Sequence, residues 1–308
     1  MALIQPPMLV HGGTHPARAM RMMIRDLARG SAGVTEGNDL RVSPLSTPGA
    51  GVRVGDGSAV IRGATWGQGS YTQYNVGDAT VPIAPTGAKP RSDLICLRVE
   101  DPEYEGNRNP ATEDIGYFHV VSGVSSTMTA TPAGMTAIPL ARLDIPANTA
   151  TITSAMIRDL RRIANPRRES TLLNSFPTAS STLKYNDNKW HKWPSAGAWN
   201  ITIPSWATTA KIVVTVAGLR MIGGNVYARM RQSLGSDVGQ ETPIDDDQAH
   251  IRRSTVVLGD TVSISASARG TTQRLSLETY MHRSESGDLT VDDGTSFFCQ
   301  IEFTEGVI

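Results

Sequence analysis

The stretch "PLARLDIPANTATITSAMIRDLRRIANP", residues 139–166, decides how this chain divides. Its first part is apolar and ends at Pro146, as a strand followed by a turn does. Thr153 or Ser154 can then cap a helix of about three turns that stops at Asn165-Pro166. Because a helix this short is marginal alone, we expect it to pack on a neighbour and to close a first domain.

The chain of 308 residues is long enough for two cores, and strand signals lie on both sides of this stretch. Before it, 91–101 reads as a central buried strand, because it is nearly continuously apolar from Leu94 to Val99. After it, 254–268 and 296–303 alternate between apolar and polar residues, which is typical of antiparallel strands. We therefore predict an N-terminal domain over 1–164, a linker over 165–171, and a C-terminal antiparallel β-sandwich, jelly-roll-like, over 172–308.

A second helix is predicted over 14–30, so the expected N-terminal domain is α+β, rich in strands and with two short helices. Apolar residues recur at helical spacing and define an expected buried face: Met20, Met23, Ile24 and Leu27. The arginines lie mostly on other faces: Arg18, Arg21, Arg25 and Arg29. They indicate either a solvated basic face or a docking surface for an acidic partner.

Composition excludes several classes of protein. The formal net charge is zero, which argues against binding nucleic acid through a broad basic field. No apolar run is long enough for a membrane helix, and the N-terminus lacks the charged region of a signal peptide, so we expect a protein assembled in the cytoplasm. Cys96 and Cys299 lie in separate apolar runs, where we expect buried thiols.

Catalytic and metal-binding patterns are missing from the sequence. There is no nucleophile elbow, phosphate-binding loop or dinucleotide fingerprint, and no catalytic residue or cofactor is predicted. The acidic run Asp245–Asp247, with Glu241 before it, lacks the spacing of a calcium loop. We interpret it as a polar loop and predict no metal site and no enzymatic activity.

Four of the five tryptophans crowd into residues 190–206. Exposed indole faces stack on sugar rings or anchor interfaces, whereas buried ones fill a core. Trp199 leads a strand and looks like a core residue. Trp190 and Trp193 are the candidate ligand or interface contacts, with core or subunit packing as the alternative.

Three pieces of the first domain together resemble the N-terminal domain of minor tail or baseplate proteins of long-tailed phages, notably those of actinobacterial hosts. They are "VRVGDGSAVIRG" (52–63), "PRSDLICLRVED" (90–101) and "LARLDIPANTATITSAMIRDLRR" (140–162). The resemblance covers roughly residues 33–163, and it rests on the order and spacing of the pieces. The C-terminal half carries no motif of this kind.

This resemblance implies a virion structural protein of the tail tip. The first domain would mount on other tail or baseplate proteins, and the second would reach a receptor on the host surface, such as a glycan. Such proteins are usually homotrimers, and three copies of the helix after residue 153 could bury Met156, Ile157 and Leu160 together at the domain junction. The alternatives are a purely architectural tail or capsid decoration protein, a polysaccharide-degrading tailspike, and a free-standing carbohydrate-binding module.

Overall fold

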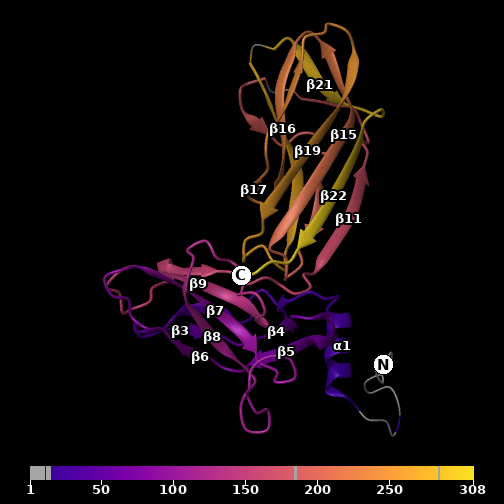
Figure 1. Ribbon diagram of the computed structural model, residues 1–308. Helices are drawn as coiled ribbons and strands as arrows, with labels where there is room; N and C mark the ends of the chain where they lie inside the picture. Colours follow the sequence, from indigo (N-terminus) through magenta and orange to yellow (C-terminus); the bar gives the residue numbers. More distant parts are fainter. Residues whose placement is uncertain (1–10, 12–14, 184–185, 284) are drawn as a thin grey trace. The chain divides into compact units, whose positions relative to one another are not determined.

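The computed structural model describes residues 11, 15–183, 186–283 and 285–308 and is mainly β (Figure 1). It divides into two compact units. The first unit is Met1–Pro166 together with Val307–Ile308, and the second is Arg167–Gly306. The chain therefore passes between the units twice, once at 166–167 and once at 306–307.

The first unit contains three antiparallel sheets and the α-helix α1 (Ala17–Leu27). The first sheet has the order β1 (Gly33–Val34), β4 (Gly57–Arg62), β5 (Ser70–Asn75). The second has the order β2 (Val42–Pro44), β3 (Gly51–Val54), β6 (Ala79–Pro82). The third has the order β10 (Ile157–Asp159), β9 (Ala137–Ile145), β7 (Arg91–Val99), β8 (Gly116–Val124). The prediction of a central strand in 91–101 is confirmed, because β7 has neighbours on both sides and is largely buried.

The helix predicted after residue 153 is wrong. Ser154–Met156 forms a single 3-10 turn, η2, and Ile157–Asp159 is the strand β10, paired with β9. The backbone N–H of Leu160 continues the pairing by donating to the Leu140 carbonyl. The arginine that follows, Arg161, is fully buried and donates to the backbone carbonyls of Gly37 and Asp39, which fixes the chain in this extended path. The segment thus closes the first unit as an edge strand, and α1 is the single α-helix of the part of the chain that the structure describes.

The predicted helix over 14–30 exists over Ala17–Leu27, but its buried side differs from the expected one. Leu27 is exposed, whereas Arg21 is buried. The Arg21 guanidinium lies 3.3 Å from the Asp101 carboxylate and 2.6 Å from that of Glu103, and its Nε donates to the Gln68 carbonyl. This part of the basic face of α1 therefore meets an acidic cluster within its own unit.

The boundary between the units, Pro166/Arg167, lies inside the predicted linker 165–171, but most of that segment is not a free linker. Arg168–Ser175 forms β11, which pairs along its whole length with β22 (Ser296–Thr304). Within the second unit, the Glu305 carboxylate accepts from the backbone N–H and the side chain of Arg167. The chain is therefore held in regular structure soon after it enters the second unit.

The second unit consists of two antiparallel sheets. The first, here called the β15 sheet, contains β11, β22, β15 (Thr209–Gly223), β21 (Gly287–Val291), β12 (Ser181–Thr182) and β19 (Arg252–Ser263). The second, the β16 sheet, contains β13 (Trp190–His191), β14 (Trp199–Thr202), β20 (Thr272–Met281), β16 (Val226–Leu234), β17 (Asp237–Val238) and β18 (Thr242–Asp246).

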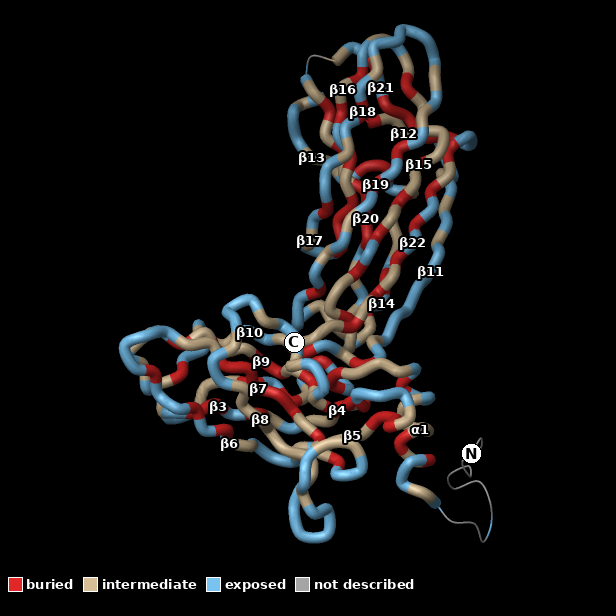
Figure 2. The backbone as a smooth tube through the Cα atoms, in the orientation of Figure 1, coloured by how far each residue is buried: buried red, intermediate tan, exposed pale blue. Residues whose placement is uncertain are grey.

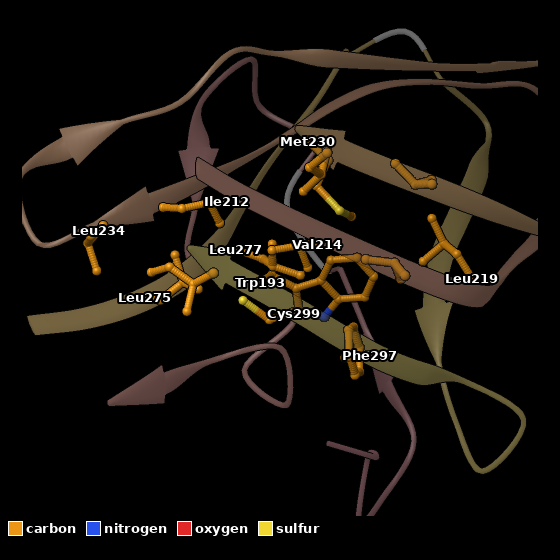
Figure 3. Close-up of a cluster of buried hydrophobic side chains, with 14 of the residues drawn as sticks. Trp193, Ile212, Val214, Leu219, Met230, Leu234, Leu275, Leu277, Phe297 and Cys299 are labelled. Carbon is orange, nitrogen blue, oxygen red and sulfur yellow. The ribbon is translucent and has the colours of Figure 1, made fainter. Parts of the chain in front are cut away.

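One hydrophobic core joins the two sheets (Figure 3). Alternate residues of β15 and β22 point into it from one side, among them Val214 and Phe297. Leu277 of β20 and Met230 of β16 meet them from the other side. Two antiparallel sheets around one core is the arrangement that the alternating sequence predicts for a sandwich.

Candidate functional site

Trp193, one of the two candidate ligand contacts, belongs to this core. It is 7% exposed, and its indole N–H donates to the Ser181 hydroxyl at 3.1 Å. Its backbone carbonyl accepts from the buried Thr279 hydroxyl. Figure 3 shows the ring among Val214, Cys299 and Phe297. In this structure Trp193 fills the core, which leaves its ring no face for a ligand.

Trp190 lies on the outer side of the β16 sheet and is half-buried. The Arg231 guanidinium carbon is 3.9 Å from the centre of its ring, which is cation–π stacking. Nε and one Nη of Arg231 donate to a carboxylate oxygen of Glu278, at 3.0 and 2.8 Å. Trp190 also meets the Tyr280 ring, at a centroid distance of 5.8 Å and a tilt of 49°.

Strand register explains why these residues meet. Trp190 of β13 pairs with Tyr280 of β20, and Tyr280 pairs on its other side with Arg229 of β16. Two residues further along, Arg231 pairs with Glu278. Paired residues on one side of a sheet are direct neighbours, so two aromatic rings and two ion-pairing positions form a single surface.

The surface continues toward β18. Glu241 accepts from Arg229 at 3.0 Å and lies 4.0 Å from Arg231, so it bridges the two arginines. Arg229 donates to the Tyr227 hydroxyl at 3.4 Å. The centre of the Tyr227 ring lies 6.2 Å from the centre of the His282 ring. We call this set the aromatic face: Trp190, Tyr227, Arg229, Arg231, Glu241, Glu278, Tyr280 and His282.

The aromatic face combines rings with paired charged groups. Its arginines and glutamates neutralise one another, so it has no strong field of either sign. Ring faces offer apolar contact to the C–H surface of a sugar, and the phenol, carboxylate and guanidinium groups offer hydrogen bonds to hydroxyls. Because Arg231 is fixed both by stacking and by its two hydrogen bonds to Glu278, part of the surface is ordered in the absence of a ligand.

The residues predicted at the domain junction lie in the first unit. Met156 and Ile157 are half-buried and pack against the core of their own unit, and Leu160 is also half-buried. The helix that was to present them does not form. Their role at a subunit contact stays a prediction, and it no longer has a helix to support it.

The acidic run is divided between different partners. Asp246 accepts from the Arg252 side chain at 2.8 Å, and Glu241 belongs to the aromatic face. Among the described residues, no three His, Cys, Asp or Glu side chains are close enough together to hold a metal ion. No helix of the described chain is long and apolar enough to cross a membrane.

The sequence indicates Trp190 as a candidate contact but does not indicate its neighbours. Tyr280 and Glu278 lie at alternate positions of β20, and this alternation places them on one side of the sheet. Arg231 and Arg229 alternate in the same way in 225–231. What the sequence does not give is the order β13–β20–β16, which brings the two strands and Trp190 together.

No family model matches the chain, and no curated protein matches it significantly. Solved structures give only weak likenesses. A chain in the structure of infectious bursal disease virus, Gx strain, has 10% sequence identity to this chain. The match covers 91% of this chain and 76% of that chain, with a TM-score of 0.26. Particles of T=1 symmetry derived from infectious bursal virus are 11% identical, with coverages of 90% and 73% and a TM-score of 0.27.

A third likeness, to dimeric latent PorU from Porphyromonas gingivalis, is 11% identical, with coverages of 91% and 23% and a TM-score of 0.26. TM-scores this low do not indicate a common fold. These likenesses therefore do not bear on the function of the chain.

Proposed function

We propose that the chain is a virion structural protein of the tail tip or baseplate of a long-tailed phage, and that its second unit attaches the particle to the host surface. The first half of the proposal is supported by the resemblance of residues 33–163 to minor tail proteins. Under this proposal, the first unit mounts on other tail or baseplate proteins. The protein acts by binding and has no catalytic step.

The aromatic face carries the second half of the proposal. It places Trp190 and Tyr280 side by side on a sheet, next to Arg231, which stacks on Trp190 and is held by an ion pair with Glu278. Rings beside polar groups are the combination that suits a glycan, which has apolar C–H faces and hydroxyl edges. We propose a cell-envelope glycan as the ligand and Trp190 as one of its contacts. Trp193 is not proposed as a contact, because it lies in the core.

A homotrimer completes the proposal. A single shallow site on an exposed sheet binds weakly, and several copies on one mount raise the effective concentration at the cell surface. The resemblance is the basis for three copies.

A purely architectural protein is the second candidate function. It fits the same two-unit organisation, with the aromatic face contacting another virion protein instead of a glycan. A polysaccharide-degrading tailspike is less well supported, because the carboxylates of the aromatic face, Glu241 and Glu278, are both engaged by arginines.

Binding to purified cell-envelope polysaccharides of actinobacteria separates these functions. The proposal expects retention of the wild-type chain on the immobilised polysaccharide, no release of oligosaccharide, and loss of retention for Trp190→Ala. Tyr74→Ala is the matched control, since it removes an exposed ring from the first unit. Released oligosaccharide would instead indicate a tailspike, and no retention across the polysaccharides tested would favour the architectural protein.

A further inference from the structure

The outer side of the β15 sheet, which faces away from the core, exposes apolar side chains in register. One row crosses four strands: Asn174 of β11 pairs with Phe298 of β22, Phe298 with Thr215 of β15, and Thr215 with Val257 of β19. Phe298 is 39% exposed and Val257 is 54% exposed. The flanking residues on β22, Phe297 and Cys299, point into the core, so the Phe298 ring has to lie on the outside.

A second row lies beside the first. Leu172 of β11 pairs with Gln300 of β22, and Gln300 pairs with Val213 of β15. Leu172 is 72% exposed. We call the two rows together the apolar sheet face: Leu172, Asn174, Val213, Thr215, Val257, Phe298 and Gln300. It accounts for three of the six large hydrophobic residues exposed on the described part of the second unit.

No charged residue lies within the two rows, and charges appear only beyond them. In the next row along β22 and β15, Glu302 pairs directly with Lys211. Beyond the other end of the face, past the bulge between Val216 and Leu219, Arg253 is held by Asp292. The face is thus an uncharged centre between locally neutralised ends, which is the composition of an interface core with a polar rim.

We infer that the apolar sheet face is the surface through which copies of this chain associate with one another. Around a symmetry axis, each residue near the axis meets the same residue of another copy, so a charge there would face a like charge. A surface that pairs with itself therefore has to be uncharged at its centre, as this one is. A partner recognised by charge would require the opposite pattern.

The edge strand β11, which contributes Leu172 and Asn174 to the face, supports this assignment. β11 forms one edge of the β15 sheet and is exposed along most of its length (Figure 2). β11 starts with the charged pair Arg168-Glu169, but residues 170–175, "STLLNS", contain none of the charges or prolines that commonly protect a free edge. The uncharged part of this edge includes Leu172, so it adjoins the apolar sheet face.

This inference supplies the contact surface for the proposed homotrimer and in that respect rests on the proposed function. The test is the solution mass of the full chain by light scattering behind a sizing column. We expect wild type to have a multiple of the single-chain mass, and Phe298→Glu and Val257→Glu, on two different strands, to have the mass of one chain. Both side chains point outward, so the circular dichroism spectra should match that of wild type.

Val238→Glu is the matched control, because Val238 is exposed on β17 of the other sheet and should leave the mass at the wild-type value. The inference is overturned if wild type is a single chain at micromolar concentration, or if both face variants fold and keep the wild-type mass. Adsorption of the wild-type chain to polysaccharide tests the proposed function separately. If the wild-type chain binds polysaccharide and both variants keep the wild-type mass, the apolar sheet face is rejected as the contact surface and the proposed function is not.

Discussion

Arg21 and Asp101 form a mostly buried ion pair in the first unit, with 3.3 Å between guanidinium and carboxylate and only 11% and 10% of their side chains exposed. Asp101 also accepts the Tyr71 hydroxyl at 2.7 Å, and the Arg21 guanidinium lies 5.7 Å from the centre of the Tyr71 ring. These contacts link helix α1 to the segment that follows β7. The helix is therefore attached largely by polar contacts, although its sequence predicts attachment by an apolar face.

Arg21→Met should destabilise the first unit by about 3–5 kcal/mol, because removing one member of a buried pair leaves the other charge uncompensated. Hydrogen exchange of the β7 and β9 amides measures this loss within the first unit. Arg53→Met is the control, since the Arg53–Asp78 pair is about half exposed and should contribute less than about 1 kcal/mol. Equal effects of the two substitutions would contradict the assignment of Arg21 as the anchor of α1.

Trp193→Ala should destabilise the second unit by about 3–5 kcal/mol, because it opens a cavity in the core and leaves the Ser181 hydroxyl without its indole donor. Urea unfolding followed by circular dichroism measures the change. Trp190→Ala is the comparison and should cost much less, since Trp190 lies on the surface. The opposite ranking would mean that the roles of the two tryptophans are exchanged.

Arg231→Lys should weaken glycan binding while leaving the fold intact. Lysine keeps the charge, but it cannot stack as a plane on Trp190 while bonding Glu278 through two nitrogens. Titration with the polysaccharide fraction that retains wild type, followed by calorimetry, should show a loss of about tenfold or more, which corresponds to about 1.4 kcal/mol. Undiminished binding by this variant would show that the ordered guanidinium has no part in recognition.

The sequence predicts an element of this fold reliably only where its apolar pattern fits a single type of secondary structure. Strict alternation in 296–303 allows only a strand with one buried side, and β22 has that form. The segment 153–164 has two readings, because Ile157, Leu160 and Ala164 fit a helical stripe while Ile157–Asp159 also fits an edge strand. Pairing with β9 and the burial of Arg161 decide between them, and both are long-range contacts that local pattern does not show.

The same limit applies to the candidate site. Clustering of tryptophans in 190–206 indicates an aromatic region, but it does not separate the ring in the core from the ring on the surface. Trp190 and His191, the two residues of β13, pair with β20. Two residues later the chain reaches Trp193, which lies in the core. Strand order, rather than composition, therefore determines which tryptophan can meet a ligand.

Acid should weaken the second unit through Asp292. The Arg253 guanidinium donates to this carboxylate at 2.8 Å, and the Gly294 backbone N–H donates to it as well, which together lower the pKa of Asp292 below its ordinary 3.8. Because its pKa is lower in the folded state, ionised Asp292 adds to the free energy of unfolding above pH 3.8. This contribution is lost as pH falls through the pKa of Asp292 in the folded state. Asp292→Asn should therefore lose stability at neutral pH and show a flatter decline in acid, measured by urea unfolding over a pH series. Asp293→Asn, at an exposed neighbour, is the control and should keep the wild-type stability at neutral pH.

Alkali should act through the two thiols. Cys96 and Cys299 are fully buried, and burial raises the pKa of each from 9.0 to about 12. In the folded protein at pH 8, both thiols should therefore resist an aromatic disulfide reagent, and both should react once guanidinium unfolds the chain. The two neutral thiols contribute to the free energy of unfolding below pH 9.0, and this contribution is lost as pH rises toward about 12. The reason is that the thiols ionise at lower pH in the unfolded chain than in the folded one. Cys299→Ala should remove the contribution of one thiol from this decline, at some cost in core packing at neutral pH. Rapid labelling of the native wild type would contradict the prediction, because it would show that the buried thiols are accessible in the folded chain.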